Sequence, residues 1–184
     1  SSRRRHTRYI SVTGVQTCAL PIFNRRGVEE NAVKLISNMR RHKLGLSIVM
    51  CDLDSFKELN DGHGHIAGDT ALKDFAAMLV RSVRKGDVVG RLGGDEFCVL
   101  LPDSNAEDAA EVMERVRSAL IAMRGEGQLY GILRASFGVT EMHPDDLHLD
   151  DLILRADQAL YSAKESGRDR IALFGRTYPL SGMA

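Results

Sequence analysis

The heptapeptide Arg-Leu-Gly-Gly-Asp-Glu-Phe at residues 91–97 places two carboxylates directly after a glycine turn and between two apolar segments. The Val-Val pair at 88–89 and the run Phe-Cys-Val-Leu-Leu at 97–101 are typical of buried strands. Adjacent glycines supply the positive φ angles of a tight turn, so the segment predicts a β-hairpin with Asp95 and Glu96 at its tip. The bare glycines let a flat ligand approach the backbone, and the acids offer oxygen ligands to a hard divalent cation. In isolation, the same segment would fit a solvated turn with exposed acids.

A second polar stretch, residues 52–69, follows an apolar strand predicted at 46–51. Asp52 is therefore expected at the carboxyl end of that strand, where open α/β sheets hold ligands. If this strand lies beside the hairpin, Asp52 converges with Asp95 and Glu96. Three carboxylates repel one another unless a cation lies among them, so the cluster predicts bound Mg²⁺ or Mn²⁺.

Other side chains in the polar segments suit a nucleotide. Lys57 offers a positive charge to phosphate, and Asn60 and Asp69 provide the amide and carboxylate that read the edge of a purine. Lys164 and Arg168 lie four residues apart at a predicted helix end that a glycine closes, so they are expected to share a face. On its own, that pair would equally fit solvated charges favoured by the helix dipole.

Three ordered blocks resemble the GGDEF domain of diguanylate cyclases. The first is Asp-x-Asp-x-Phe-Lys-x-x-Asn-Asp-x-x-Gly-His-x-x-Gly-Asp at 52–69, and the second is Arg-x-Gly-Gly-Asp-Glu-Phe at 91–97. The third, Arg-Ala-Asp-Gln-Ala-Leu-Tyr-Ser-Ala-Lys-Glu-Ser-Gly-Arg at 155–168, is similar to the last helix of that family. The resemblance covers residues 23–174 and implies that two GTP molecules are condensed into cyclic di-GMP, with release of pyrophosphate, by a homodimer.

The resemblance also implies the residues that would perform this chemistry. Two Mg²⁺ or Mn²⁺ ions would be held by Asp52, the backbone carbonyl of Leu53, Asp95 and Glu96, and the last two would be catalytic. Because neighbouring strand residues point to opposite faces, Asp95 and Glu96 are expected to have unequal roles unless the turn distorts the strand. The residues implied in GTP binding are Phe56, Lys57, Asn60, His65, Asp69, Gly93, Gly94, Lys164 and Arg168.

An inhibitory site for the product is implied at Arg84, Asp87 and Arg115, because the family places an Arg-x-x-Asp pair at this distance before the hairpin. Arginine suits phosphate and stacks on guanine, and aspartate accepts hydrogen bonds from the guanine edge. An ordinary charged turn with an exposed arginine nearby explains the same residues.

Other functions remain open at this point. A non-catalytic GGDEF module that binds GTP or cyclic di-GMP and signals through a partner is the main alternative to an enzyme. A cyclase that uses ATP is disfavoured by the pair Asn60 and Asp69, because adenine lacks the paired N1 and N2 donors of guanine. A phosphodiesterase is disfavoured because a second, glutamate-rich domain does not fit in 184 residues.

The composition predicts one soluble domain in the cytoplasm. The chain has 184 residues, 43% of them hydrophobic and 27% charged, and a formal net charge of zero, so its charge gives no reason to expect nucleic-acid or membrane partners. The three cysteines, Cys18, Cys51 and Cys98, are scattered and fit a reducing compartment better than a disulfide framework.

The expected organisation is a non-native leader at 1–22, which resembles a translated sequencing adapter, an N-terminally truncated GGDEF domain at 23–175, and a tail at 176–184. The fold class is α/β (α+β), a mixed, largely antiparallel five-stranded sheet covered by helices in the palm-like nucleotidyl cyclase fold that the resemblance implies. The strands are predicted at 46–51, 88–92, 96–101, 133–140 and 171–174. Helical spacing of apolar residues predicts helices at 28–39, 72–83, 109–120 and 152–163, the third after a Ser104-Asn105 cap.

Overall fold

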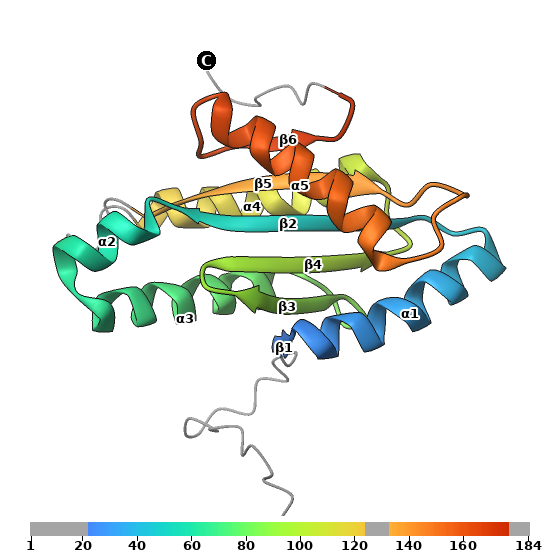
Figure 1. The fold of residues 1–184 in the computed structure, drawn as a ribbon, viewed down its shortest axis with the longest axis horizontal. Coiled ribbons are helices and arrows are strands. Elements are labelled where there is room, and N and C mark those ends of the chain that lie inside the picture. Colours follow the sequence, from blue (N-terminus) through green and yellow to red (C-terminus); the bar gives the residue numbers. More distant parts are fainter. Residues whose placement is uncertain (1–21, 124–132, 177–184) are drawn as a thin grey trace, which may run out of the picture.

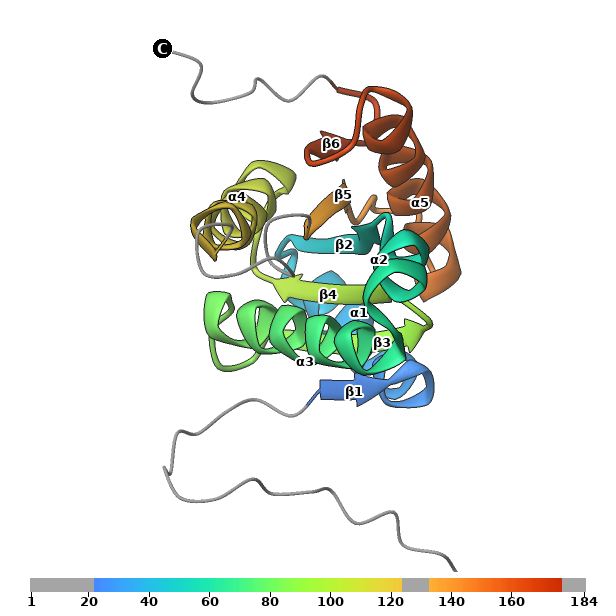
Figure 2. The same ribbon diagram turned by 90° about the vertical axis from the view of Figure 1, so that its left-hand side faces the viewer.

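The computed structural model describes residues 22–123 and 133–176, which form one mixed sheet with helices on both faces (Figures 1 and 2). The strands are β1 (Ile22–Asn24), β2 (Leu46–Asp54), β3 (Val88–Gly93), β4 (Glu96–Pro102), β5 (Arg134–Glu141) and β6 (Ile171–Leu173). The helices are α1 (Arg25–His42), α2 (Phe56–His63), α3 (His65–Ser82), α4 (Ala106–Met123) and α5 (Leu149–Glu165). No helix among these described residues is long and apolar enough to cross a membrane.

The strands lie in the order β1-β3-β4-β2-β5-β6. The inner pairs β3–β4, β4–β2 and β2–β5 are antiparallel, whereas β1 and β6 join the edges in parallel. The predicted mixed, largely antiparallel sheet is therefore confirmed. All nine residues of the central strand β2 are buried, so its polar residues Ser47, Asp52 and Asp54 lie inside the protein.

Two apolar layers hold the helices against the sheet. One contains the buried faces of α3 and α4, with Phe75 of α3 against Phe97 of β4 at 5.2 Å between ring centroids. The other contains the buried faces of α1 and α5, and the end-on view of Figure 2 shows α4 and α5 on opposite sides of the sheet. Alternation along β2 sends Leu53 into the first layer, so Asp52 and Asp54 face the side of α5.

The fold differs from the predicted one in two strands and one helix. A sixth strand, β1, pairs with β3 and begins at Ile22, a residue that the sequence interpretation assigned to the leader. Three residues are too few to show a periodic pattern, which is why the strand was missed. Strand β2 continues to Asp54, because Asp52 and Asp54 stay in the ladder between β4 and β5. Helix α2 was not predicted, because its sequence carries Gly62 and only one buried residue, Leu59.

The four predicted helices are present, each longer than its predicted stripe, and α3 begins at His65, seven residues before the predicted start. The predicted cap of α4 is confirmed at Asn105, whose side chain accepts from the amide of Asp108 at 2.8 Å. Of the predicted leader and tail, the structure describes Ile22 and Arg176. The remaining residues of both segments, including Cys18, lie outside the described residues.

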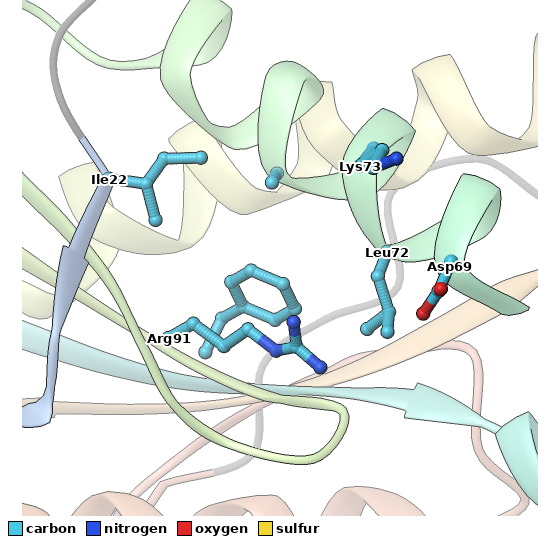
Figure 3. A pocket seen from close by; sticks show the side chains of 7 residues that line it. Ile22, Asp69, Leu72, Lys73 and Arg91 are labelled. Carbon is cyan, nitrogen blue, oxygen red and sulfur yellow. The ribbon is translucent and has the colours of Figure 1, made fainter. Parts of the chain in front are cut away.

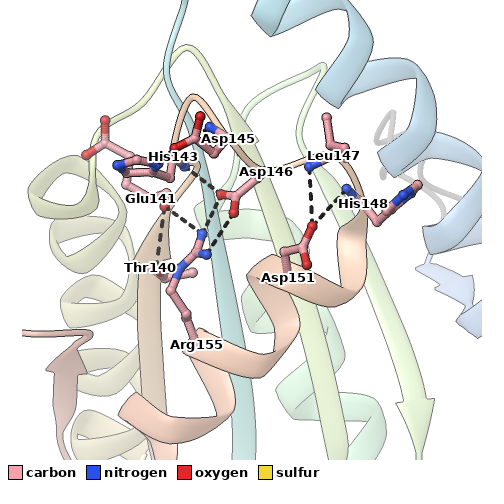
Figure 4. Close-up of polar contacts among 9 residues, drawn as sticks. All are labelled: Thr140, Glu141, His143, Asp145, Asp146, Leu147, His148, Asp151 and Arg155. Carbon is pink, nitrogen blue, oxygen red and sulfur yellow. Dashed lines mark hydrogen bonds and ion pairs between the residues drawn. The ribbon is translucent and has the colours of Figure 1, made fainter.

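A polar network anchors α5 to the far end of β5 (Figure 4). Arg155 donates to both carboxylate oxygens of Asp146, at 2.8 and 2.5 Å, and the amide of His143 donates to the same group at 2.6 Å. Burial alone would raise the pKa of Asp146, but these hydrogen bonds outweigh it and the pKa is lowered. The start of α5 is thereby fixed, and its last turn lies near the opposite end of the sheet.

A close approach of α5 to β5 requires glycine at position 138. A Cβ there would lie 2.1 Å from the carbonyl oxygen of Ala156 and 2.2 Å from the amide of Leu160, both backbone atoms of α5. We predict that Gly138→Ala lowers the free energy of unfolding by about 1–3 kcal/mol, because the helix must shift away from the sheet.

Urea denaturation checks this prediction, with Gly62→Ala as the matched control. Gly62 lies in α2, and a Cβ added there would meet nothing within 4 Å. That substitution should be neutral or stabilise by up to about 1 kcal/mol, because alanine favours helix. Equal stability of Gly138→Ala and the wild type would contradict the close approach.

Candidate active site

Two acids face each other across the central strands of the sheet. Asp52 of β2 is the direct antiparallel partner of Glu96, the first residue of β4. Side chains opposite each other in such a pair lie on one face with Cβ atoms about 4.5–5.5 Å apart, and like charges there are destabilising. Asp52 is 9% exposed, whereas Glu96 is exposed. A positive charge beside Asp52 would offset the cost of burying its carboxylate.

Lys164, in the last turn of α5, supplies such a charge. Its Nζ lies 2.8 Å from Oδ1 of Asp52. Burial raises the pKa of Asp52, and the charges of Asp95 and Asp54 raise it further. Lys164 lowers the pKa but does not outweigh burial, so the pKa remains raised. Asp157, on the same helix, belongs to the same electrostatic group: burial and then the charge of Glu96 raise its pKa, against the effect of Lys164 and Arg25. The sequence interpretation gave Asp157 no role.

The hairpin tip has the predicted form with one difference. Gly94 has a positive φ of 44°, whereas Gly93 ends β3 in an extended conformation. The Nε of Arg91 donates to the carbonyl of Gly94 at 2.8 Å and holds the turn. Asp95 lies in the turn and is half-buried, while Glu96 starts β4, so the two acids occupy unequal positions.

The three carboxylates predicted as metal ligands lie at the same end of the sheet. Asp52 and Glu96 are cross-strand partners, and the charge of Asp95 reaches Asp52. Within residues 22–123 and 133–176, however, no three His, Cys, Asp or Glu side chains are gathered closely enough to hold a metal ion together. In this conformation Lys164 occupies one oxygen of Asp52.

Leu53 and Asp54 complete this end of β2. The side chain of Leu53 is 1% exposed and belongs to the apolar layer on the other face of the sheet, so its backbone is the part available to the site. Asp54 accepts from the hydroxyl of Ser136 at 2.8 Å and from the amide of Asp169 at 2.9 Å. These bonds tie β2 to β5 and to the segment after α5. The signal for Asp54 in the sequence is its spacing of two from Asp52, which places both on one face.

The predicted base-binding residues lie on α2 and α3, which Gly64 alone separates. A Cβ on Gly68 would lie 2.0 Å from Oδ1 of Asn60 and 3.2 Å from the ring of Phe56, so only glycine allows these side chains to rest on α3. Asn60 is thereby held beside the residue that precedes Asp69. The remaining predicted residues of this region, Lys57, His65 and Asp69, are exposed.

A cavity of about 400 Å³ lies between α3 and the hairpin. Figure 3 shows Asp69 and Arg91 beside it, with Leu72 between them and Ile22 at the other side. The ring of Phe97 contributes to its apolar lining. Apolar walls with a few polar groups at the edge are typical of small-molecule sites. Arg91 and Phe97 were read as parts of the hairpin motif, but no role as lining residues was predicted for them.

The prediction that Lys164 and Arg168 share a helix face is wrong. Helix α5 ends at Glu165, and Arg168 lies beyond it in the left-handed region with φ of 60°. Its amide donates to the carbonyl of Ala163 at 3.1 Å, which closes the helix end. The chain reverses here because Gly167 also has a positive φ, a turn that helical spacing cannot reveal.

Of the predicted product-site residues, Arg84 and Asp87 follow the end of α3, and Arg115 lies on α4. The amide of Arg84 donates to Asp87 at 2.8 Å, and its guanidinium donates to the carbonyls of Pro102 and Asp103 at 2.7 and 3.1 Å. Arg115 donates to the carbonyl of Ser82 at 3.4 Å. Arg84 and Arg115 thus approach the same turn, and Arg84 also fastens that turn to the end of β4.

Comparison with known proteins agrees with the motifs. The sequence profile of the family described as diguanylate cyclase, GGDEF domain, matches residues 21–170. The chain is 36% identical over 165 residues to the protein named probable diguanylate cyclase DgcC of Escherichia coli K12, and covers 44% of it with 90% of its own length. It is 38% identical over 152 residues to diguanylate cyclase DgcP of Pseudomonas aeruginosa, and covers 22% of it with 80% of its own length. The chain thus spans less than half the length of these curated relatives.

A solved structure has the same fold. The active GGEEF domain of a diguanylate cyclase from Vibrio cholerae superposes with a TM-score of 0.78 at 29% identity, and the match covers 85% of this chain and 99% of that one. The palm-like, mixed sheet covered by helices is therefore confirmed.

The buried charge of Asp52 should make stability depend on pH. Its pKa is raised above the ordinary 3.8, so the ionised group destabilises the fold at neutral pH, and this effect disappears as the pH falls below 3.8. We predict that Asp52→Asn unfolds at higher urea than the wild type at pH 7 in EDTA, and that the difference shrinks towards about pH 3.5. The exposed Asp61→Asn serves as control and should differ little at either pH. A less stable Asp52→Asn at pH 7 would show that the Lys164 pair outweighs burial.

Proposed function

The chain belongs to the family of diguanylate cyclase GGDEF domains, and from this membership we propose that it condenses two GTP molecules into cyclic di-GMP as a homodimer. The observation that carries the proposal is the buried Asp52 opposite Glu96 at a glycine hairpin, with Lys164 beside it. The reaction needs the 3′-hydroxyl of each GTP to attack the α-phosphate of the other, so that two phosphodiester bonds form and two pyrophosphates leave. Each domain would hold one GTP, so two domains must face each other.

The donor set of the site fits divalent cations such as Mg²⁺ or Mn²⁺. Carboxylate oxygens are their preferred ligands, and the opposition of Asp52 and Glu96 is relieved by a positive charge. We assign Asp52, Asp95, Glu96 and the carbonyl of Leu53 to holding two such ions. Bound there, the ions would neutralise charge on the reacting phosphate and lower the pKa of the attacking hydroxyl. Asp95, in the turn that Arg91 fastens, would accept the proton of that hydroxyl.

The triphosphate is assigned to positive groups around the end of β2. Lys164 would leave Asp52 as a cation binds and turn to phosphate, because an ammonium is a compact point charge on a flexible stem. Lys57 and Arg168 would add two further charges. These side chains orient the α-phosphate while the ions balance its charge.

The guanine is assigned to the region of α2 and α3. Asn60, Asp69 and His65 would read or line the base, since a carboxylate accepts from the N1 and N2 donors of guanine. Phe56 would contribute its ring, and the hairpin glycines Gly93 and Gly94 would let the nucleotide approach the backbone. Of these residues, Asp69 lines the cavity of about 400 Å³ between α3 and the hairpin.

Inhibition by the product is assigned to Arg84, Asp87 and Arg115. To bind cyclic di-GMP, the guanidinium of Arg84 would have to exchange the carbonyls of Pro102 and Asp103 for phosphate. The proposed site then couples product binding to the turn before β3.

We assign the reaction to the cytoplasm. Cys51 and Cys98 are buried free thiols, and burial raises the pKa of Cys98 to about 12. Such thiols suit a reducing compartment.

Turnover of GTP tests the proposal. The chain is fused at its N-terminus to a parallel coiled coil, which supplies dimerisation, and cyclic di-GMP is measured by mass spectrometry at saturating Mg²⁺. The wild type should form product, whereas Asp52→Asn and Glu96→Gln should each lose at least about a hundredfold, because each removes a charge needed in the transition state. Glu111→Gln, an exposed acid of α4, is the control and should keep its activity.

Two outcomes would count against the enzyme. Near-normal turnover in both site variants would contradict the assigned roles of Asp52 and Glu96. A wild type that binds GTP without forming product would favour the alternative, a module that binds nucleotide and signals through a partner.

A further inference from the structure

A second cavity lies beyond the end of β2, next to the acid pair. Its volume is about 380 Å³, and it is lined by Asp54, Ser55, Glu58, Leu59, Arg134, Gly167 and Arg168. Two arginines from different parts of the chain therefore line one space. Arg134 is the first residue of β5, and Arg168 follows α5. The sequence interpretation included Arg168 but gave Arg134 no role.

The strand register places Arg134 close to the acid pair. Arg134 is the direct partner of Asp54, just as Ser136 is the partner of Asp52. Along β5, Arg134 therefore lies two residues, about 6–7 Å, from Ser136, the position opposite Asp52. Its side chain lies on the same face of the sheet as that of Asp52. A chain of phosphates that begins at Asp52 and Lys164 would reach this cavity.

In the part of the chain that the structure describes, no hydrogen bond or ion pair engages the guanidinium of Arg134 or of Arg168. Asp54, opposite Arg134, is instead occupied by Ser136 and by the amide of Asp169. By contrast, Arg117 and Arg155 are paired with Glu114 and Asp146.

The backbone beside the cavity also favours an anion. Ser55 precedes α2 with φ of 57°, and its side chain makes no capping hydrogen bond. The first amides of α2 therefore have no side-chain cap, and the positive end of the helix dipole lies at Ser55, in the cavity wall. Unpaired guanidiniums and an uncapped helix start together form an environment for phosphate.

We propose that Arg134 is a substrate-binding residue that, with Arg168, holds the terminal phosphates of the nucleoside triphosphate. This inference rests on the proposed function, because it takes GTP as the ligand of the neighbouring site. Two guanidinium forks hold phosphate oxygens in fixed directions, which a single ammonium cannot do. Asp54 and Glu58 also line the cavity, and their negative charges oppose an anion there, so both arginines are needed to offset them.

The alternative is that Arg134 only balances the charges of Asp54 and Glu58. The two roles differ in what they predict for ligands. A phosphate-binding arginine affects a nucleoside triphosphate more than a monophosphate, whereas a structural counterion affects both equally or neither.

Calorimetric titration distinguishes these roles. The ligands are GMP and an α,β-methylene analogue of GTP, which binds without turnover, at a fixed Mg²⁺ concentration. Arg134→Gln should bind the analogue about tenfold more weakly than the wild type and bind GMP within about twofold. Arg134→Lys keeps the positive charge but not the two-pronged guanidinium, so its affinity for the analogue should fall less. This variant replaces Arg134→Gln in the test if Arg134→Gln fails to fold. The control is Arg81→Gln, which removes an exposed arginine from the last turn of α3, roughly 24 Å along the helix from His65.

The outcomes separate this inference from the proposed function. If the wild type binds neither ligand, the proposed function fails and the inference fails with it. If the wild type binds the analogue and Arg134→Gln binds it equally well, the inference alone is overturned. Equal losses for the analogue and for GMP would also overturn it, because Arg134 would then not act through the terminal phosphates.

Discussion

The opposition of Asp52 and Glu96 across β2 and β4 is the constraint on which the rest of the site depends. Asp52 is buried and shares a face of the sheet with Glu96, and the Nζ of Lys164 places a positive charge 2.8 Å from its Oδ1. The position of Lys164 depends on how closely α5 lies on the sheet, and Gly138 allows that approach. A backbone contact in the middle of β5 thus sets the electrostatics at the end of β2.

Hydrogen bonds fix the residues around the pair Asp52 and Glu96. Asp54 is fixed by Ser136 and by the backbone after α5, and the hairpin is fastened by Arg91. The burial that raises the pKa of Asp52 works against stability. Such a cost at a rigid, acidic site is typical of a position selected for binding or chemistry rather than for folding.

Much of the fold could be predicted because strong apolar patterns decide it. The hairpin at 91–97, the strands around it and the four amphipathic helices follow from residue periodicity. Strand β1 and the extension of β2 could not be predicted, since their pairing depends on partners distant in the sequence. The predicted position of Arg168 on helix α5 was wrong, because a left-handed turn ends the helix before that residue. Arg134 was missed, because only the strand register shows that it lies opposite Asp54.

The central claim is that the opposed acids are arranged for a divalent cation, with Lys164 as the counterion in its absence. The most direct measurement is the titration of Mn²⁺ into the nucleotide-free protein, followed by the loss of the electron paramagnetic resonance signal of free Mn²⁺. The account predicts saturable binding to the wild type, at least about tenfold weaker binding to Glu96→Gln, and tighter binding to Lys164→Met because a competing cation is removed. Binding that is unchanged in both variants would contradict it.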